Sequence, residues 1–168
     1  KARHSSQIAL HSALKLFNQI IENHAQGNCV LNALFGQAKI YFRMERWKES
    51  EQKMLEVLTL VPPDHLAVEV LLSLGDFYRT PSNSLYNLQQ SIKHYHEILE
   101  RYPKNAPYPS TYLALAHSYR EDREYNKAIS YYKKIIDDFP DSFQAPLAQS
   151  MLGLCYEESS KIDQSLLA

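Results

Sequence analysis

Apolar residues recur at helical spacing along almost the whole chain. In segments 50–60 and 128–136 they lie three and four positions apart, which is the period of an amphipathic α-helix. Long alternation of apolar and polar residues, the signature of strands, is missing from the sequence, and the chain has only four glycines. The pattern therefore predicts an all-α protein. The expected helices cover about 6–24, 29–44, 47–60, 65–79, 85–101, 108–122, 125–138 and 143–158, with a last one beginning near 161.

Prolines and tyrosines show that these helices repeat. Pro62, Pro103 and Pro140 each end a helix-like run, and a tyrosine follows each of them sixteen positions later. From Tyr41 to Pro62 and from Tyr119 to Pro140 the distance is 21, which gives a period of 37. Between Tyr78 and Pro103 it is 25, so we expect an insertion of four residues in or near 80–87, TPSNSLYN. Counting back sixteen positions from Tyr41 places a fourth end-of-repeat position, equivalent to the three prolines, at Ala25.

Other positions follow the same register. The first helix of each repeat, helix A, carries a small residue three positions before its tyrosine: Ala38, Gly75, Ala116 and Gly153. The second, helix B, carries in turn a small, a bulky and a β-branched residue: Ala13, Phe17 and Ile20; Ser50, Met54 and Val57; Ser91, Tyr95 and Ile98; Ala128, Tyr132 and Ile135. Small residues let helices approach closely, and bulky ones fill the adjacent space. Gly27, Asp64, Asn105 and Ser142 are the expected helix N-caps.

The pattern resembles the tetratricopeptide repeat family, whose units carry Leu-Gly-x-x-Tyr, then Ala-x-x-x-Phe, then Pro. Segments LALAHSY (113–119), AISYY (128–132) and LGLCY (152–156) carry the resemblance. It implies a right-handed superhelical solenoid of antiparallel helix pairs, with about four repeats. We expect one array over 1–168: a helix B at 6–25, repeats at about 27–62, 64–103 and 105–140, and a partial repeat at 142–168. The longer period and FPDSFQAPLAQSMLGLCY (139–156) are similar to a bacterial variant found in the cell-envelope lipoprotein of the outer-membrane β-barrel assembly machinery.

Composition narrows the possible partners. Eighteen basic and nineteen acidic residues give a net charge of −1, whereas a nucleic-acid-binding domain usually has a basic excess. No apolar run is long enough to span a bilayer. The first residues, KARHSSQ, lack an initiator Met and a signal peptide, and QSLLA resembles an interrupted helix, so both ends are expected to be internal to a longer chain. The sequence is compatible with either the cell envelope or the cytoplasm.

The sequence contains no recognisable catalytic or metal-binding motif. The two cysteines, Cys29 and Cys155, are expected to be buried apolar residues, because they form no metal-binding or disulfide pattern. His94 and His96 are two positions apart on a helix, so they point to different faces and cannot share a metal. Catalytic and phosphate-binding motifs are missing as well. We therefore expect no catalytic residues, no metal, no cofactor and no enzymatic activity.

The resemblance instead implies a binding groove on the concave face, lined by helix A residues. Transferred by register, its expected residues are Phe35, Lys39, Phe42, Arg43, Leu72, Asp76, Arg79, Leu113, His117 and Arg120. Arginine can hold a carboxylate with two parallel hydrogen bonds, and phenylalanine anchors apolar side chains. An acidic-hydrophobic peptide is therefore the expected ligand. The alternative is a structural or assembly module of a larger protein that uses its convex face, its ends or the 80–87 loop. Exposed array ends would also favour self-association.

One segment, EYNKAISYYKKIIDDFP (124–140), interleaves tyrosine with lysine as nucleic-acid-binding surfaces do. The repeat register assigns most of it to packing, through Ala128, Tyr132, Ile135 and Pro140, and leaves Tyr131 partly exposed. Its lysines are offset by Glu124, Asp137 and Asp138. Nucleic-acid binding is therefore not expected.

Overall fold

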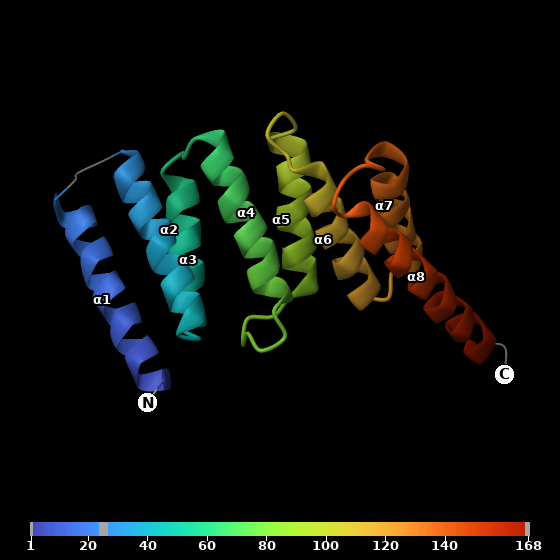
Figure 1. Cartoon of the computed structure of the whole chain (residues 1–168), viewed down its shortest axis with the longest axis horizontal. Coiled ribbons are helices and arrows are strands. Elements are labelled where there is room, and N and C mark those ends of the chain that lie inside the picture. The colour runs from blue at the N-terminus through green and yellow to red at the C-terminus, as the bar shows by residue number, and fades with distance from the viewer. Residues whose placement is uncertain (1, 24–26, 167–168) are drawn as a thin grey trace. The chain divides into compact units, whose positions relative to one another are not determined.

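A computed structural model gives the structure of the chain for residues 2–23 and 27–166, with side chains described over 7–23 and 27–160. Eight α-helices make up this part of the chain, and it contains no strand (Figure 1). The prediction of an all-α protein is confirmed. The helices are α1 (Ala2–Asn23), α2 (Asn28–Arg43), α3 (Trp47–Thr59), α4 (Asp64–Arg79), α5 (Leu88–Arg101), α6 (Tyr108–Glu121), α7 (Tyr125–Asp138) and α8 (Ala145–Leu166).

The chain divides into two compact units, residues 1–86 (unit 1) and residues 87–168 (unit 2). Within unit 1, α1 packs on α2, α2 on α3, and α3 on α4. Within unit 2, α5 packs on α6, α6 on α7, and α7 on α8. Within each unit, each helix thus contacts its neighbour in sequence, as in a solenoid of the tetratricopeptide type. A single array over 1–168 and the handedness of its superhelix stay predictions.

Burial follows the repeat register. The small, bulky and β-branched positions of the helix B elements α3, α5 and α7 are all at most 3% exposed, and they are Ser50, Met54, Val57, Ser91, Tyr95, Ile98, Ala128, Tyr132 and Ile135. In helix A, Ala38 and Ala116 are equally buried. Gly153, the same position in α8, is exposed. The register therefore identifies the packing faces of α2, α3, α5, α6 and α7.

The connections from helix A to helix B agree with the predicted insertion. Residues 44–46 and 122–124 make two short connections, whereas residues 80–87 make a longer one. Asn83 organises the longer loop: its buried side chain donates to the carbonyl oxygen of Phe77 and accepts from the backbone N–H of Leu85, both at 2.8 Å. The side chain of Asn87 then caps α5 by accepting from the N–H of Gln90 at 3.1 Å. For this reason α5 begins at Leu88 and not at 85.

The predicted N-caps are correct only at Gly27. Pro63 precedes α4, which begins at Asp64 itself, and α6 begins at Tyr108 after Pro107. Proline disfavours helical conformation in the residue before it, so α6 cannot begin ahead of Pro107. At α8, two turns over residues 139–145 delay the start to Ala145. Ala25, the fourth end-of-repeat position, lies outside the described residues.

The expected last helix from 161 is wrong, because α8 runs without a break from Ala145 to Leu166. The short connections of the other repeats turn at a residue with positive φ four positions after the tyrosine, Glu45 (58°) and Arg123 (62°). In α8 that position is Ser160, whose hydroxyl donates to the carbonyl oxygen of Glu157 at 2.9 Å within the helix. Glycine, asparagine and proline are also missing there, so nothing in the local sequence ends the helix.

The two cysteines differ in exposure. Cys155 is buried as expected, but Cys29 is exposed, because the inward stripe of α2 runs through Val30, Leu31 and Leu34.

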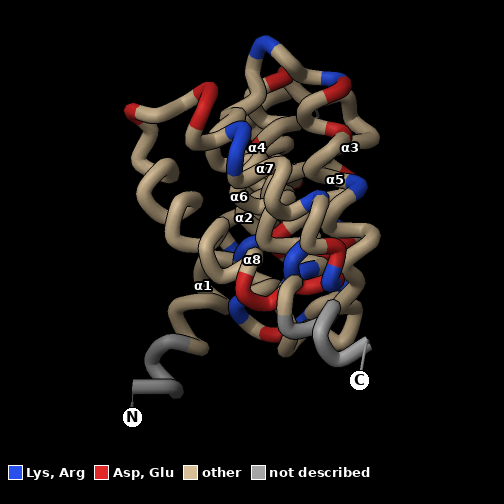
Figure 2. Tube along the Cα trace, turned by 90° about the vertical axis from the view of Figure 1, so that its right-hand side faces the viewer, with Lys and Arg blue, Asp and Glu red and all other residues tan. Residues whose placement is uncertain are grey.

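None of the helices in the described part combines the length and apolar content needed to cross a membrane. Basic and acidic residues are interspersed along the trace, in line with the near-zero net charge (Figure 2).

Candidate binding cleft

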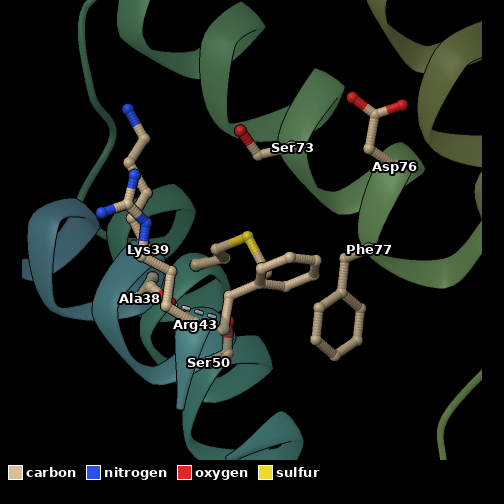
Figure 3. A pocket seen from close by; sticks show the side chains of 9 residues that line it. Ala38, Lys39, Arg43, Ser50, Ser73, Asp76 and Phe77 are labelled. Atoms are coloured by element: carbon tan, nitrogen blue, oxygen red, sulfur yellow. Dashed lines mark hydrogen bonds between the residues drawn. The ribbon is translucent and has the colours of Figure 1, made fainter. Parts of the chain in front are cut away.

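A cleft of about 330 Å³ opens in unit 1 between α2, α3 and α4 (Figure 3). Two consecutive A helices, α2 and α4, form its walls, and the B helix α3 lies between them in the chain. Its lining residues are Ala38, Lys39, Phe42, Arg43, Ser50, Met54, Ser73, Asp76 and Phe77. The cleft therefore lies on helix A positions, where the resemblance places a groove.

Close contact between α2 and α3 forms the base of the cleft. The hydroxyl of Ser50 donates to the carbonyl oxygen of Ala38 at 2.9 Å, and both residues are almost completely buried. Larger side chains at these two positions would hold the helices apart. The small-residue positions of the repeat thus create the geometry of the cleft as well as the packing of the pair.

Aromatic rings support the apolar side of the cleft. The ring of Phe42 lies 5.3 Å from that of Trp47 and 6.1 Å from that of Phe77, centroid to centroid. Trp47 in turn lies 6.3 Å from Phe77. Edge-to-face and tilted contacts of this kind are favourable beyond the area that they bury. Phe42 is half-buried, so part of its ring remains available to an apolar ligand group.

The two walls carry opposite charge. Lys39 and Arg43 lie on the α2 side, while Asp76 lies with Ser73 on the α4 side (Figure 3). The Nζ of Lys39 is 2.7 Å from Oε1 of Glu69 and 4.0 Å from the ring centroid of Phe35. Both partners of this ion pair are more than half exposed, so the pair contributes little free energy and can exchange with a ligand. Arg43 is exposed and makes no ion pair with another described residue.

Four of the ten predicted groove residues line this cleft: Lys39, Phe42, Arg43 and Asp76. Arg79 lies one turn from Asp76, with 3.7 Å between its Nη2 and Oδ1 of Asp76, and Leu72 is half-buried on the same helix. Phe35 is only 3% exposed and packs in the core beneath Lys39. Its place in the register is as predicted, but little of its ring is accessible to a ligand.

The other three predicted residues, Leu113, His117 and Arg120, belong to α6 in unit 2. Arg120 lies 3.1 Å from Oε1 of Glu158 on α8, and the ring of His117 lies 5.9 Å from that of Tyr132. Burial raises the pKa of Tyr132 to about 12 and raises the pKa of the neighbouring Cys155 thiol. These groups hold α6, α7 and α8 together. Leu113, also on α6, is half-buried.

The sequence analysis did not predict five of the residues that line the cleft: Ala38, Ser50, Met54, Ser73 and Phe77. Ser50 and Met54 were assigned to packing, and their positions beside the cleft depend on how α3 lies against α2. Ser73 could have been found, because it lies five positions before Tyr78, on the same side of α4 as Asp76. Groups of three or more metal-ligating side chains do not occur among the described residues.

Comparison with known families adds independent evidence for the repeat. Residues 110–142 match the family model described as tetratricopeptide repeat. The match begins in α6, covers α7 and ends just after Pro140, so it corresponds to the third complete repeat in the predicted register. It supports the tetratricopeptide repeat family for this chain. Repeats of this family are generally protein–protein interaction modules. No curated protein matches the chain.

Proposed function

We propose that the protein is a non-enzymatic scaffold that binds a segment of a partner protein in the cleft between α2 and α4. The observation that carries the proposal is the meeting of Lys39, Phe42, Arg43 and Asp76 around one cleft. These residues come from equivalent faces of two successive A helices. A similar surface on each repeat would let an extended ligand contact several repeats in turn.

The side chains of the cleft define the chemistry of the ligand. An apolar side chain would enter beside Phe42 and above Met54, where water is displaced from an apolar surface. A neighbouring carboxylate would pair with Arg43, which can donate two parallel hydrogen bonds, and would be attracted by Lys39. Asp76 on the opposite wall would accept from a backbone N–H of the ligand. An acidic-hydrophobic segment satisfies these requirements.

Two fluorescently labelled peptides test this proposal, one alternating leucine with glutamate and the other alternating leucine with lysine. We expect the acidic peptide to bind more tightly, as measured by fluorescence anisotropy. The Arg43→Glu variant should weaken its binding about tenfold or more, since a hydrogen bond to a charged group contributes roughly 1.5–3 kcal/mol. Lys48→Glu is the matched control, because Lys48 is an exposed cation of α3 that does not line the cleft.

Arg43 is a better position for this test than Phe42 or Arg79. Phe42 contacts Trp47 and Phe77, so its truncation would disturb the core, and Arg79 interacts with Asp76. An Arg43→Glu variant that binds the acidic peptide as tightly as the unmodified chain would overturn the assignment of the cleft. Equal binding of the acidic and basic peptides would overturn the proposed ligand chemistry.

A further inference from the structure

The cation of Lys39 already has a carboxylate partner on the opposite side of the cleft. Its Nζ on α2 is 2.7 Å from Oε1 of Glu69 on α4, so the ion pair joins the two A helices that form the cleft walls. Lys39 lines the cleft, and Glu69 lies one helical turn before the lining residue Ser73. Glu69 therefore holds a carboxylate where the cleft would otherwise offer a cation to a ligand.

Arg43 is the second cation of the same wall, and it is held differently. It lies four positions after Lys39, so both side chains project from one face of α2, about 6 Å apart along the helix axis (Figure 3). Arg43 is exposed and makes no ion pair with another residue of the described part. A ligand carboxylate can therefore reach Arg43 without displacing a protein group, whereas at Lys39 it must replace Glu69.

The two cations match the spacing of alternate residues in an extended segment. Each residue of a strand rises about 3.3 Å, and residues i and i+2 point to the same side, so their side chains begin about 6.6 Å apart. Two glutamates separated by one residue can thus reach Lys39 and Arg43 together. The hydroxyl of Ser73 does not bind Glu69's carboxylate in their place, because it donates to the backbone carbonyl oxygen of Glu69 at 2.9 Å.

We propose that Glu69 is an internal competitor for the ligand, and that a ligand with two carboxylates two residues apart displaces it from Lys39. This inference rests on the proposed function and adds the spacing of the ligand's carboxylates to it. Displacement costs little, because the side chains of Lys39 and Glu69 are 54% and 55% exposed and the released carboxylate stays hydrated. A ligand with a single carboxylate binds at Arg43 and leaves the ion pair intact. The cleft therefore distinguishes acidic ligands by the spacing of their charges.

Two labelled peptides of identical composition test this inference. Both carry two glutamates in a host that alternates leucine with glutamine. The glutamates are two residues apart in the first peptide and six apart, about 20 Å when extended, in the second. Glu69→Gln should tighten binding of the first peptide about two- to fivefold, the range that an exposed ion pair contributes, and leave binding of the second unchanged. Fluorescence anisotropy at low ionic strength measures both affinities, since salt screens exposed charges.

Glu56→Gln is the matched control. Glu56 pairs with Lys53 on α3, also at 2.7 Å, and neither residue lines the cleft. The variant has the same change in net charge as Glu69→Gln and should bind both peptides like the unmodified chain. Equal tightening of the two peptides by Glu69→Gln, no tightening of the first, or the same tightening by Glu56→Gln would each overturn the inference.

Arg43→Glu separates a failure of this inference from a failure of the proposed function. If Arg43→Glu weakens both peptides while Glu69→Gln does not favour the first, the cleft still binds acidic segments and only the role of Glu69 is wrong. Unchanged binding of both peptides to Arg43→Glu would overturn the proposed function, and this inference with it.

Discussion

Ser50 of α3 donates a hydrogen bond to the carbonyl oxygen of Ala38 in α2, across 2.9 Å, and neither residue is more than 1% exposed. This contact joins the small positions of helix A and helix B in one repeat. It also forms the base of the cleft, because both residues line it. The contact therefore links the packing of the repeat to its candidate binding surface.

Two substitutions at Ser50 separate the hydrogen bond from the size of the side chain. Ser50→Ala should lower the free energy of unfolding by about 0.5–1.5 kcal/mol, since it removes one intramolecular hydrogen bond and keeps the close approach. Ser50→Leu should cost more, because overpacking of about 1–3 kcal/mol is added to that loss. Urea denaturation measures both values. If Ser50→Leu proved no less stable than Ser50→Ala, close approach of α2 and α3 would not be required.

Gly36 makes a similar contact between α1 and α2. A Cβ at this position would overlap the ring of Phe17, so Gly36→Ala should displace α1. We expect a net loss of about 1–2 kcal/mol, because overpacking exceeds the roughly 0.5–1 kcal/mol that alanine gains over glycine in a helix. Hydrogen exchange should show the loss of protection concentrated in α1.

Gly153 provides the matched control for this experiment. It is also helical, but an added Cβ would meet nothing within 4 Å. Gly153→Ala should therefore stabilise α8 by about 0.5–1 kcal/mol. If both substitutions stabilised the chain equally, the contact between Phe17 and Gly36 would not contribute to the docking of α1.

His96 should make the stability of unit 2 depend on pH. Burial lowers its pKa, nearby Lys127 and Lys134 lower it further, and Glu100 opposes them. The folded state therefore favours the neutral ring, which lies 2.9 Å from the hydroxyl of Tyr119. The unfolded chain takes up a proton near pH 6.5, so the free energy of unfolding should fall as the pH falls through this value. The decline should end below the folded-state pKa.

Thermal unfolding followed by circular dichroism between pH 7.5 and about 5 measures this effect. His96→Gln keeps a hydrogen-bonding group beside Tyr119 and should reduce the pH dependence. His65→Gln, which removes an exposed histidine of α4, is the control. An unchanged slope in His96→Gln would show that other groups cause the pH dependence.

The sequence was sufficient to predict the helices and their packing faces, because both follow from spacing. The period of 37 correctly placed Met54, Tyr95 and Tyr132 in the core, and the longer interval before Pro103 correctly predicted the extended loop. The register failed at the end of α8. It implied a turn before a new helix near 161, and the local residues do not encode that turn. A helix boundary depends on its own residues even inside a repeat.

The cleft was only partly predictable. Register places Lys39, Phe42, Arg43 and Asp76 on the helix faces that line the cleft, but it cannot tell that Phe35 lies beneath Lys39 and away from solvent. Such differences depend on side-chain conformation and on the helix that packs alongside. Tyr131 is a second example. The register gave it no packing role, yet its ring stacks on that of Tyr119 and contacts that of Tyr112. Its aromatic partners come from another helix, so they could not be read from its own segment.

Trp47 provides a direct measurement of ligand binding in the cleft. It is the only tryptophan in the chain, and its ring contacts those of Phe42 and Phe77, which both line the cleft. A ligand that packs against Phe42 should change the environment of the indole ring. Titration with the acidic peptide should therefore change Trp47 emission with the same midpoint as the anisotropy of the labelled peptide.

Two variants define what this signal means. Arg43→Glu should weaken both signals together, because it removes the proposed partner of the ligand carboxylate and leaves the indole in place. Trp47→Phe should abolish the emission change and preserve the anisotropy change, since phenylalanine retains an aromatic ring beside Phe42. An anisotropy change without any response from Trp47 in the unmodified chain would place the peptide on a different surface. The cleft between α2 and α4 would then have to be abandoned as the binding site, although the repeat fold would be unaffected.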